Sequence, residues 1–293
     1  MNTYLECSPC FLMQALEASK MLGLNQKEKK EILDAAAMKI IKMDLESSPP
    51  EMGRTIHRIV KQKTGNPDPY KDIKQRSNNA ALQIYPELKN ITSNSGDSLL
   101  KAVEIAIAGN IIDYGAVFDL DMEQEIQKFL DSGERIFTNE KLFAYAEFAK
   151  ALKKANTLLY LGDNTGEIVF DRVLIEEIKY KYPDLKIYFA TRGAPIINDC
   201  LIDDAISCGI DKSAEIISNG YDAPGTILEK CSPEFRKIWN ESDLVLSKGQ
   251  GNFESLTDST KPIFFLLIVK CQVVANYLNC GLRDIILSKN HNI

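Results

Sequence analysis

The sequence has 293 residues, of which 45% are hydrophobic and 26% charged, and its net charge is −6. These values are typical of a soluble globular protein that is long enough to bury a sizeable core, and no apolar run approaches the ~20 residues that span a bilayer. The negative net charge also argues against a general nucleic-acid binder, which needs a basic face to neutralise phosphates.

The start of the chain and its cysteines predict a cytoplasmic protein. The first seven residues, Met-Asn-Thr-Tyr-Leu-Glu-Cys, contain neither the basic start nor the apolar stretch of a secretory signal. Seven cysteines, an odd number, are more typical of reduced thiols than of a disulfide framework.

The first 150 residues carry only helical patterns. One helix is predicted to begin at Ser8-Pro9, and apolar residues recur at helical spacing over 24–45, 52–60, 71–88, 98–113, 122–130 and 140–151. We therefore expect an all-helical domain over residues 1–150.

Two polar features stand out in this helical region. Cys7 and Cys10 form a lone C-x-x-C, which is half of a metal site or a redox pair, and a structural role is the simpler interpretation. Asn110 and Asp113 lie three residues apart on one face of an apolar helix, where they either cap the helix or face a site and support its ligands from behind. His57 is expected to be packed rather than to bind a ligand.

From residue 156 the pattern changes to short apolar strands that alternate with helices. Strands are predicted at 158–161, 187–190, 215–218, 244–246 and 264–269, with a possible sixth at 285–287. Helices are predicted between them at 166–181, 201–207, 226–239, 253–256 and 272–278. This alternation predicts an open, mostly parallel α/β sheet, and we assign it to a second domain over residues 151–293.

The loop after the first predicted strand, residues 162–166, reads Gly-Asp-Asn-Thr-Gly. Asp163 and Asn164 could offer two hard oxygen atoms to a divalent cation at the carboxyl end of that strand, where open α/β sheets bind ligands. The alternative is that these residues only form a good turn.

Polar residues also follow the other predicted strands, and parallel strands bring them to one edge of the sheet. Asp199 would join Asp163 and Asn164 as a metal ligand. Lys248 and Lys270 would bind an anion, and the backbone N–H groups near Gly249 and Gly251 could approach an oxyanion. A cation, two lysines and an amide-rich loop are the equipment of phosphoryl chemistry.

Several better-known signatures are absent. The sequence contains no G-x-x-x-x-G-K-[ST] and no G-x-G-x-x-G after the first strand. A methyltransferase that binds its cofactor on a glycine-rich loop would carry an acid after the second strand, where this chain has Thr191-Arg192. Haloacid-dehalogenase phosphatases carry a second Asp two residues after the first, and here the position two residues after Asp163 is occupied by Thr165.

Taken together, these motifs resemble the damage-control phosphatase family, also called the acidic-residue-methyltransferase-like group or domain of unknown function 89. The resemblance rests on Gly162-Asp163-Asn164-Thr165-Gly166-Glu167, Lys248-Gly249-Gln250-Gly251-Asn252-Phe253-Glu254 and Lys270-Cys271. The N-terminal C-x-x-C, Gly109-Asn110-Ile111-Ile112-Asp113 and Asn198-Asp199 resemble its stand-alone archaeal and bacterial members.

The resemblance covers nearly the whole chain and implies a three-layer α/β/α Rossmann-like domain with a helical N-terminal domain. It implies metal-dependent hydrolysis of phosphate monoesters on small metabolites, with Mg, Mn, Co or Ni as cofactor. Carried over residue by residue, the family's metal ligands match Asp163, Asn164 and Asp199. Its catalytic residues match Asp163, Asn164 and Lys270. The loop of Gln250, Gly251, Asn252 and Glu254 matches the substrate-contacting segment. Glu167 is expected to lie behind the metal ligands and to support them.

The substrate loop departs from the pattern of relatives that act on sugar phosphates, which reads Asp-Leu-Asn-Tyr-Arg. Gln250, Gly251 and Glu254 differ, and the last replaces a cation with an anion. The sequence is compatible with attack on phosphorus by either a water molecule or Asp163. Two alternatives remain: a carboxyl methyltransferase that uses S-adenosylmethionine, and a non-catalytic metal- or nucleotide-binding protein. Neither the substrate nor the oligomeric state is predicted.

Overall fold

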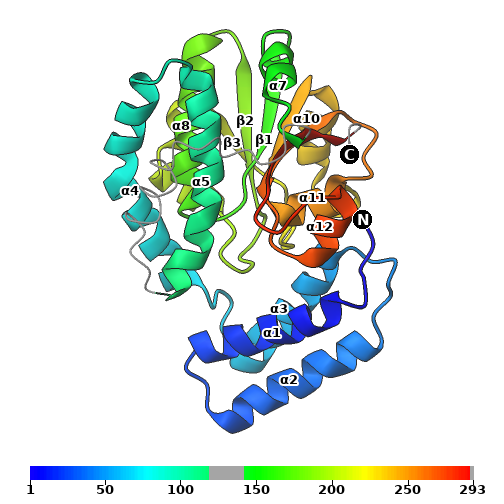
Figure 1. Ribbon diagram of the computed structural model, residues 1–293. Coiled ribbons are helices and arrows are strands. Elements are labelled where there is room, and N and C mark those ends of the chain that lie inside the picture. Colours follow the sequence, from blue (N-terminus) through cyan, green and yellow to red (C-terminus); the bar gives the residue numbers. More distant parts are fainter. Residues whose placement is uncertain (119–141, 291–293) are drawn as a thin grey trace.

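A six-stranded mixed sheet forms the centre of the fold (Figure 1). The structure is a computed structural model that describes residues 1–118 and 142–290, and the side chains of the first range up to residue 109. The strands are β1 (Thr157–Leu161), β2 (Lys186–Thr191), β3 (Glu215–Ser218), β4 (Leu244–Lys248), β5 (Ile263–Ile268) and β6 (Ile285–Lys289). The first five run parallel in the order β3-β2-β1-β4-β5, and β6 pairs antiparallel with β5.

All six predicted strands are confirmed, the possible sixth as β6. Their short apolar runs are buried because helices cover both faces of the sheet, and parallel strands covered on both faces read as continuous apolar segments rather than alternating ones. In β1, Leu158 and Tyr160 contribute to the core on one face, and Leu159 and Leu161 to the core on the other.

Two helical groups pack against the sheet. One buried cluster joins its first face to helices α4 (Lys71–Ser93), α5 (Ser98–Phe118), α7 (Tyr145–Leu152), α8 (Glu167–Lys181) and α9 (Ile202–Ser207). A second cluster joins the opposite face to α10 (Pro233–Glu241), α11 (Gln250–Leu256) and α12 (Gln272–Leu278).

The first three helices form a separate small cluster beside one end of the sheet (Figure 1). They are α1 (Cys7–Met21), α2 (Gln26–Ile41) and α3 (Pro49–Thr64). Asn25 begins α2 with a capping box closed by Glu28, and Gly65, in the left-handed region at φ 67°, ends α3. The domain boundary at residue 150 stays a prediction. The buried clusters follow a different division, because α4 and α5, which precede residue 150, pack into the same core as the sheet.

Three predicted helices differ from the structure or lie outside it. The helix expected over 226–239 is replaced by a short 3-10 turn (Leu228–Lys230) and α10, because Ser232 accepts a hydrogen bond from the Phe235 N–H and Pro233 fixes the first turn. The helix expected over 253–256 begins earlier, at Gln250. The helix expected over 122–130 lies outside the described residues.

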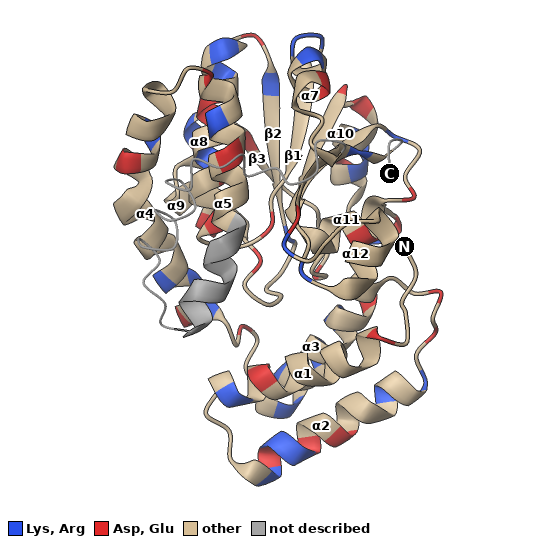
Figure 2. Cartoon of the chain, in the orientation of Figure 1, with Lys and Arg blue, Asp and Glu red and all other residues tan. Residues whose placement is uncertain are grey.

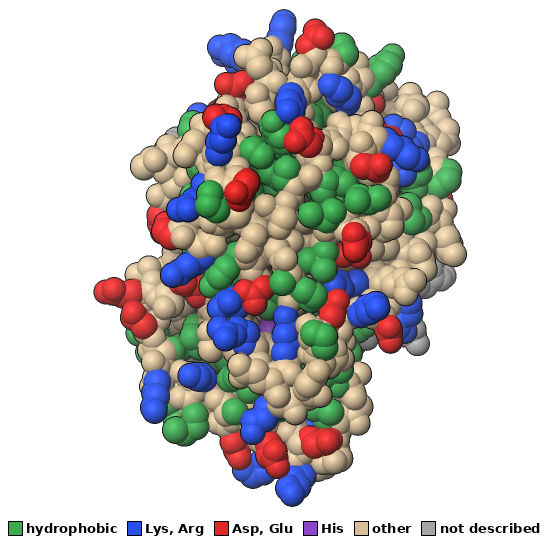
Figure 3. All heavy atoms as spheres, turned by 180° about the vertical axis from the view of Figure 1, so that it is seen from behind, with side chains coloured by type: hydrophobic (Ala, Val, Ile, Leu, Met, Phe, Trp, Pro, Cys, Tyr) green, Lys and Arg blue, Asp and Glu red, His purple; other side chains and the backbone are tan. Residues whose placement is uncertain are grey.

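The surface carries both signs of charge. Figure 2 shows basic and acidic residues interspersed along the helices, and Figure 3 shows the same mixture on the opposite face. Among the helices that the structure describes, none combines the length and apolarity needed to cross a membrane.

Candidate active site

The carboxyl ends of the parallel strands face a cavity of about 500 Å³ that α1 and α3 cover from the other side. The cavity lies where the strand order reverses, between β1 and β4, which is the position where open α/β sheets bind ligands. Asp163, Asn164, Asp199 and Lys270 all line it, as the strand ends predicted.

The loop after β1 is tied to the loop after β2. Asn164 and Asp199 form an isolated antiparallel bridge, and the Cys200 N–H donates to the Asp163 carbonyl at 2.9 Å. Thr165 reinforces the link, because its N–H donates to the Asn198 carbonyl at 2.9 Å. These backbone bonds hold Asp163 and Asp199 together although 36 positions separate them in the sequence.

Arg192 is the site residue that the sequence analysis missed. Its side chain is buried, its Nε donates to Asp199 at 2.6 Å, and its Nη2 lies 3.3 Å from an oxygen of Asp163. Nη1 donates to the Asn252 side chain at 3.0 Å. One guanidinium therefore fixes the orientation of both carboxylates, which its planar, forked donors suit.

Gly249 has a different role from the one expected. Its N–H donates to the Leu266 carbonyl, so this group is engaged in the sheet rather than directed to an oxyanion. Its backbone lies at φ 80°, and a Cβ atom there would come within 1.9 Å of the Asp163 carboxylate. Glycine is required because Asp163 packs directly against this backbone.

Lys248 is the clearest correction to the predicted site. Its ammonium group is buried beneath the cavity floor, where it donates to Glu167 at 2.6 Å, to Asp171 at 2.5 Å and to the Ala106 carbonyl at 2.8 Å. As the last residue of β4 it points towards α8 and α5, and it is not among the cavity-lining residues. Direct phosphate binding by Lys248 is therefore not supported, whereas Glu167 lies behind the site as expected.

Two cations are buried at or behind the cavity. Arg192 faces Asp163 and Asp199, and Lys248 faces Glu167 and Asp171, so each of these cations serves two carboxylates. Burial raises the pKa of the Asp163 carboxyl well above its ordinary value. Glu167 and Asp199 raise this pKa further, and Arg192 and Lys270 oppose the rise.

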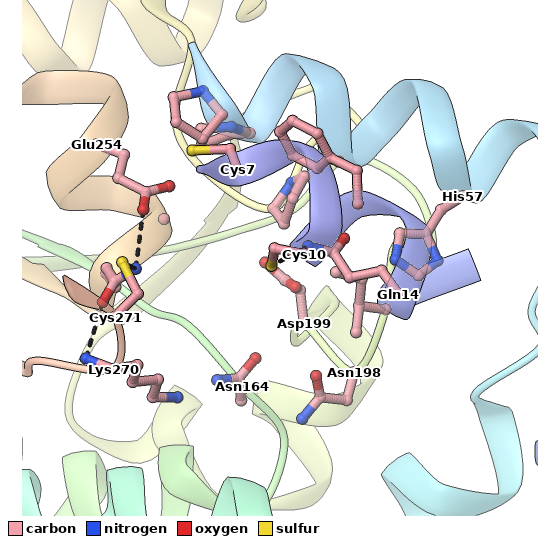
Figure 4. A pocket seen from close by; sticks show the side chains of 18 of the residues that line it. Cys7, Cys10, Gln14, His57, Asn164, Asn198, Asp199, Glu254, Lys270 and Cys271 are labelled. Carbon is pink, nitrogen blue, oxygen red and sulfur yellow. Dashed lines mark hydrogen bonds between the residues drawn. The ribbon is translucent and has the colours of Figure 1, made fainter. Parts of the chain in front are cut away.

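A side wall of the cavity is formed by the start of α11 and by the residues that follow β5. Gln250 links them: its amide donates to Glu254 at 2.8 Å, and its oxygen accepts from the Lys270 N–H at 3.0 Å. Figure 4 shows the Lys270 side chain extending towards Asn164, across the cavity from α1. Burial raises the pKa of Glu254 to about 7, although Gln250 and the N-terminal amine oppose the rise.

Comparison with known proteins identifies the family. Residues 3–286 match the damage-control phosphatase ARMT1-like domain. The chain belongs to this family. An uncharacterised protein of Methanocaldococcus jannaschii is 38% identical, over 97% of this chain and 94% of that protein. A damage-control phosphatase of Archaeoglobus fulgidus is 35% identical, over 96% of each chain.

A solved structure agrees with the assignment. A damage-control phosphatase of Pyrococcus horikoshii is 31% identical over 99% of each chain. The crystal structure of a family protein from that organism, described there as a DUF89 family protein, matches with a TM-score of 0.87 and 29% identity over 99% of each chain. The resemblance stated from the motifs is thus confirmed.

The remaining residues predicted for the site fall into three groups. Gly251 lines the cavity, and Asn252 does not, because its amide holds Arg192 and the Lys248 carbonyl. Cys7 and Cys10 also line the cavity, and all seven cysteines are free thiols. The side chains of Asn110 and Asp113 lie outside the described residues.

The candidate metal ligands are two carboxylates and one amide. In the part of the chain that the structure describes, no three His, Cys, Asp or Glu side chains are grouped so as to hold a metal ion. A site built on Asp163, Asn164 and Asp199 would therefore depend on the Asn164 amide and on ligands from solvent or substrate, as Mg²⁺ sites commonly do.

Proposed function

We propose that this protein is a metal-dependent phosphatase that hydrolyses phosphate monoesters of small metabolites, such as sugar phosphates, nucleotides or related damaged metabolites. One observation carries the proposal: two buried carboxylates, an amide and an ammonium group meet in one cavity at the switch point of the sheet. Relatives named damage-control phosphatases support it. The proposal includes a three-layer Rossmann-like domain and action in the cytoplasm, without nucleic acid or membrane.

The donor set fits a hard divalent cation. Asp163, Asn164 and Asp199 offer oxygen atoms, which Mg²⁺ and Mn²⁺ prefer, and Co²⁺ or Ni²⁺ would also be accepted. Asp163 and Asp199 place two carboxylates side by side in the cavity, and such a pair attracts a divalent cation. When bound, such an ion polarises the phosphoryl group and neutralises its charge.

The residues of the chain would contribute orientation and charge. Both oxygens of Asp163 accept hydrogen bonds, from Arg192 at 3.3 Å and from the Asn164 amide at 3.1 Å, which fixes the plane of the carboxylate. Lys270, at the end of β5, would hold a phosphoryl oxygen by its positive charge. The cover formed by α1 and α3 would limit the access of bulk water and strengthen these interactions.

The experiment is a phosphate-release assay on a panel of metabolites with several divalent metals. Asp163→Ala and Asp199→Ala should each lower turnover of a generic aryl phosphate by at least ~100-fold while the proteins stay folded. The exposed Asp203, on α9, provides a matched control as Asp203→Ala. Near-full turnover by Asp199→Ala with Mn²⁺ would contradict the metal assignment.

The same assay separates the alternatives. A non-catalytic metal-binding protein would be stabilised by the metal but would release no phosphate. A methyltransferase would give heat on titration with S-adenosylmethionine, for which we expect none.

A further inference from the structure

A buried side chain outside the cavity joins the two loops that carry the candidate metal ligands. Asn78, on α4, is 3% exposed and is not among the residues that line the cavity. Its Oδ1 accepts a hydrogen bond from the Gly166 N–H at 2.8 Å, and its Nδ2 donates to the Asp204 carboxylate at 3.0 Å. The two partners fix the orientation of the amide, because a backbone N–H can only donate and a carboxylate accepts.

Each partner of Asn78 is continuous with one of these two loops. Gly166 ends the loop that follows β1. Asp204 lies in α9, and its second carboxylate oxygen accepts from the Leu201 N–H at 2.9 Å, which anchors the chain two residues after Asp199. One amide therefore connects the end of the first loop with the segment that follows the second.

The bond to Gly166 holds a backbone that has few alternatives. Gly166 lies at φ 78°, a positive angle that favours glycine, and directly precedes the first residue of α8. Its hydrogen bond to Asn78 is buried, and a buried N–H that loses its partner is unfavourable, so the loop would have to shift to find another. Such a shift would carry Asp163 and Asn164 with it.

Arg192 and Asn78 act on different parts of the same loops. Arg192 holds the carboxylate groups of Asp163 and Asp199 from within the site. Asn78 holds the backbone from the side of α4, which packs along α8 (Figure 1). A divalent ion such as Mg²⁺ requires ligand oxygens close to ideal octahedral positions, so its affinity depends on the spacing that these two residues set.

We propose that Asn78 is a positioning residue of the candidate metal site, which sets the spacing between Asp163 and Asp199 and thereby the affinity for a divalent cation. The inference rests on the proposed metal-dependent function and adds a residue that lies outside the cavity. Groups that orient metal ligands from behind typically contribute roughly 10–100-fold to metal affinity or activity. Loss of the Asn78 amide should therefore weaken metal binding without removing any ligand.

A purely structural role for Asn78 predicts a different result. Substitutions that only loosen the packing of α4 would lower stability and leave the metal affinity unchanged. Tyr85 provides this comparison, because it lies about two helical turns beyond Asn78 and its hydroxyl donates to Glu176 on α8 at 2.7 Å. Tyr85→Phe breaks this contact but should bind metal like the wild-type protein.

The experiment measures the affinity for Mn²⁺ directly, by electron paramagnetic resonance of the free ion, without substrate and on variants whose circular dichroism is that of the wild type. Asn78→Ala should raise the Kd for Mn²⁺ by at least ~10-fold. Asn79→Ala changes the exposed neighbour on α4 and is the matched control, which should leave the Kd unaltered. At saturating Mn²⁺, Asn78→Ala should regain most of its phosphate release, because its candidate ligands are intact, whereas Asp199→Ala should not.

A second variant covers the case in which Asn78→Ala does not fold. Asp204→Ala removes the other end of the link at a half-buried position, and the loss of its bond to Asn78 should raise the Kd by at least ~5-fold. Asp203→Ala removes the same charge from an exposed neighbour. The comparison of the two therefore separates the hydrogen bond from the loss of a negative charge.

The outcomes separate this inference from the proposed function. If the wild-type protein neither binds Mn²⁺ nor needs a metal to release phosphate, the metal-dependent function fails and the positioning role falls with it. If the wild-type protein binds Mn²⁺ but each folded variant, Asn78→Ala or Asp204→Ala, binds it equally tightly, only the positioning role is overturned. An equal rise in Kd for Tyr85→Phe would overturn it too, because the effect would then be a general loss of packing.

Discussion

Replacing Gly249 by alanine should abolish activity without unfolding the protein. The backbone of Gly249 lies at φ 80° and ψ 160°, a region that is nearly exclusive to glycine, so a side chain there costs ~1–3 kcal/mol of strain. The added Cβ atom would also come within 1.9 Å of the Asp163 carboxylate, whereas real Cβ contacts are essentially never shorter than 3.0 Å.

The carboxylate of Asp163 must therefore retreat by about 1 Å, and this strains its hydrogen bonds to Arg192 and Asn164. A displacement of that size at a reacting centre costs about 100-fold in rate. We expect kcat/KM for 4-nitrophenyl phosphate with Mn²⁺ to fall by at least that factor, while far-UV circular dichroism remains that of the wild type.

Gly65→Ala is the matched control for backbone strain. Gly65 ends α3 at φ 67°, and a Cβ atom there would meet nothing within 4 Å. This variant should lose ~1 kcal/mol of stability and keep its turnover. A folded Gly249→Ala that retained more than about a third of the wild-type kcat/KM would contradict this prediction. Such a loss is far smaller than a displacement of about 1 Å should cause, so the contact between Gly249 and Asp163 would not matter for catalysis.

Two further predictions concern individual charges. Lys248→Met should lower the free energy of unfolding by ~3–5 kcal/mol, because Glu167 and Asp171 lose their buried cation, whereas Lys270→Met should lower kcat/KM by ~100-fold with little loss of stability. Urea unfolding and phosphate release measure both, and the reverse pattern would restore Lys248 as the phosphate ligand. The raised pKa of Glu254, about 7 against an ordinary 4.5, means that the folded protein loses stability as the pH rises from about 4.5 to about 7, by up to ~3 kcal/mol. Glu254→Gln should remove this loss, and parallel stability curves for the two proteins between pH 4.5 and 8 would contradict it.

The strands and their polar ends could be predicted because they depend on local pattern. A short apolar run such as Leu158–Leu161, followed by glycine and acids, is sufficient to place β1 and the site loop. Parallel pairing then brings Asp163 and Asp199 to one edge of the sheet, whatever the details of packing.

The direction of a side chain at the end of a strand could not be predicted in the same way. Lys248 and Lys270 both end strands in the sequence, yet the first points beneath the floor of the cavity and the second lines it. A signal was available: Glu167 and Asp171 lie four residues apart and flank the apolar run Ile168-Val169-Phe170, and a buried acidic pair requires a cation.

Arg192 and the cover of the cavity depend on contacts between distant segments. An arginine after a strand is usually solvated, and its burial here requires Asp199, Thr226 and Asn252 from three other segments. The sequence likewise shows that α1 and α3 have apolar faces but not that His57 and Gln14 on them line the same cavity as Asp163.

The most direct test of the central claim is phosphate release from 4-nitrophenyl phosphate before and after removal of metal. The account predicts that EDTA abolishes turnover by the wild-type protein, that Mn²⁺ restores it, and that the same Mn²⁺ concentration does not restore it in Asp199→Ala. Turnover that persists undiminished after exhaustive chelation would contradict it.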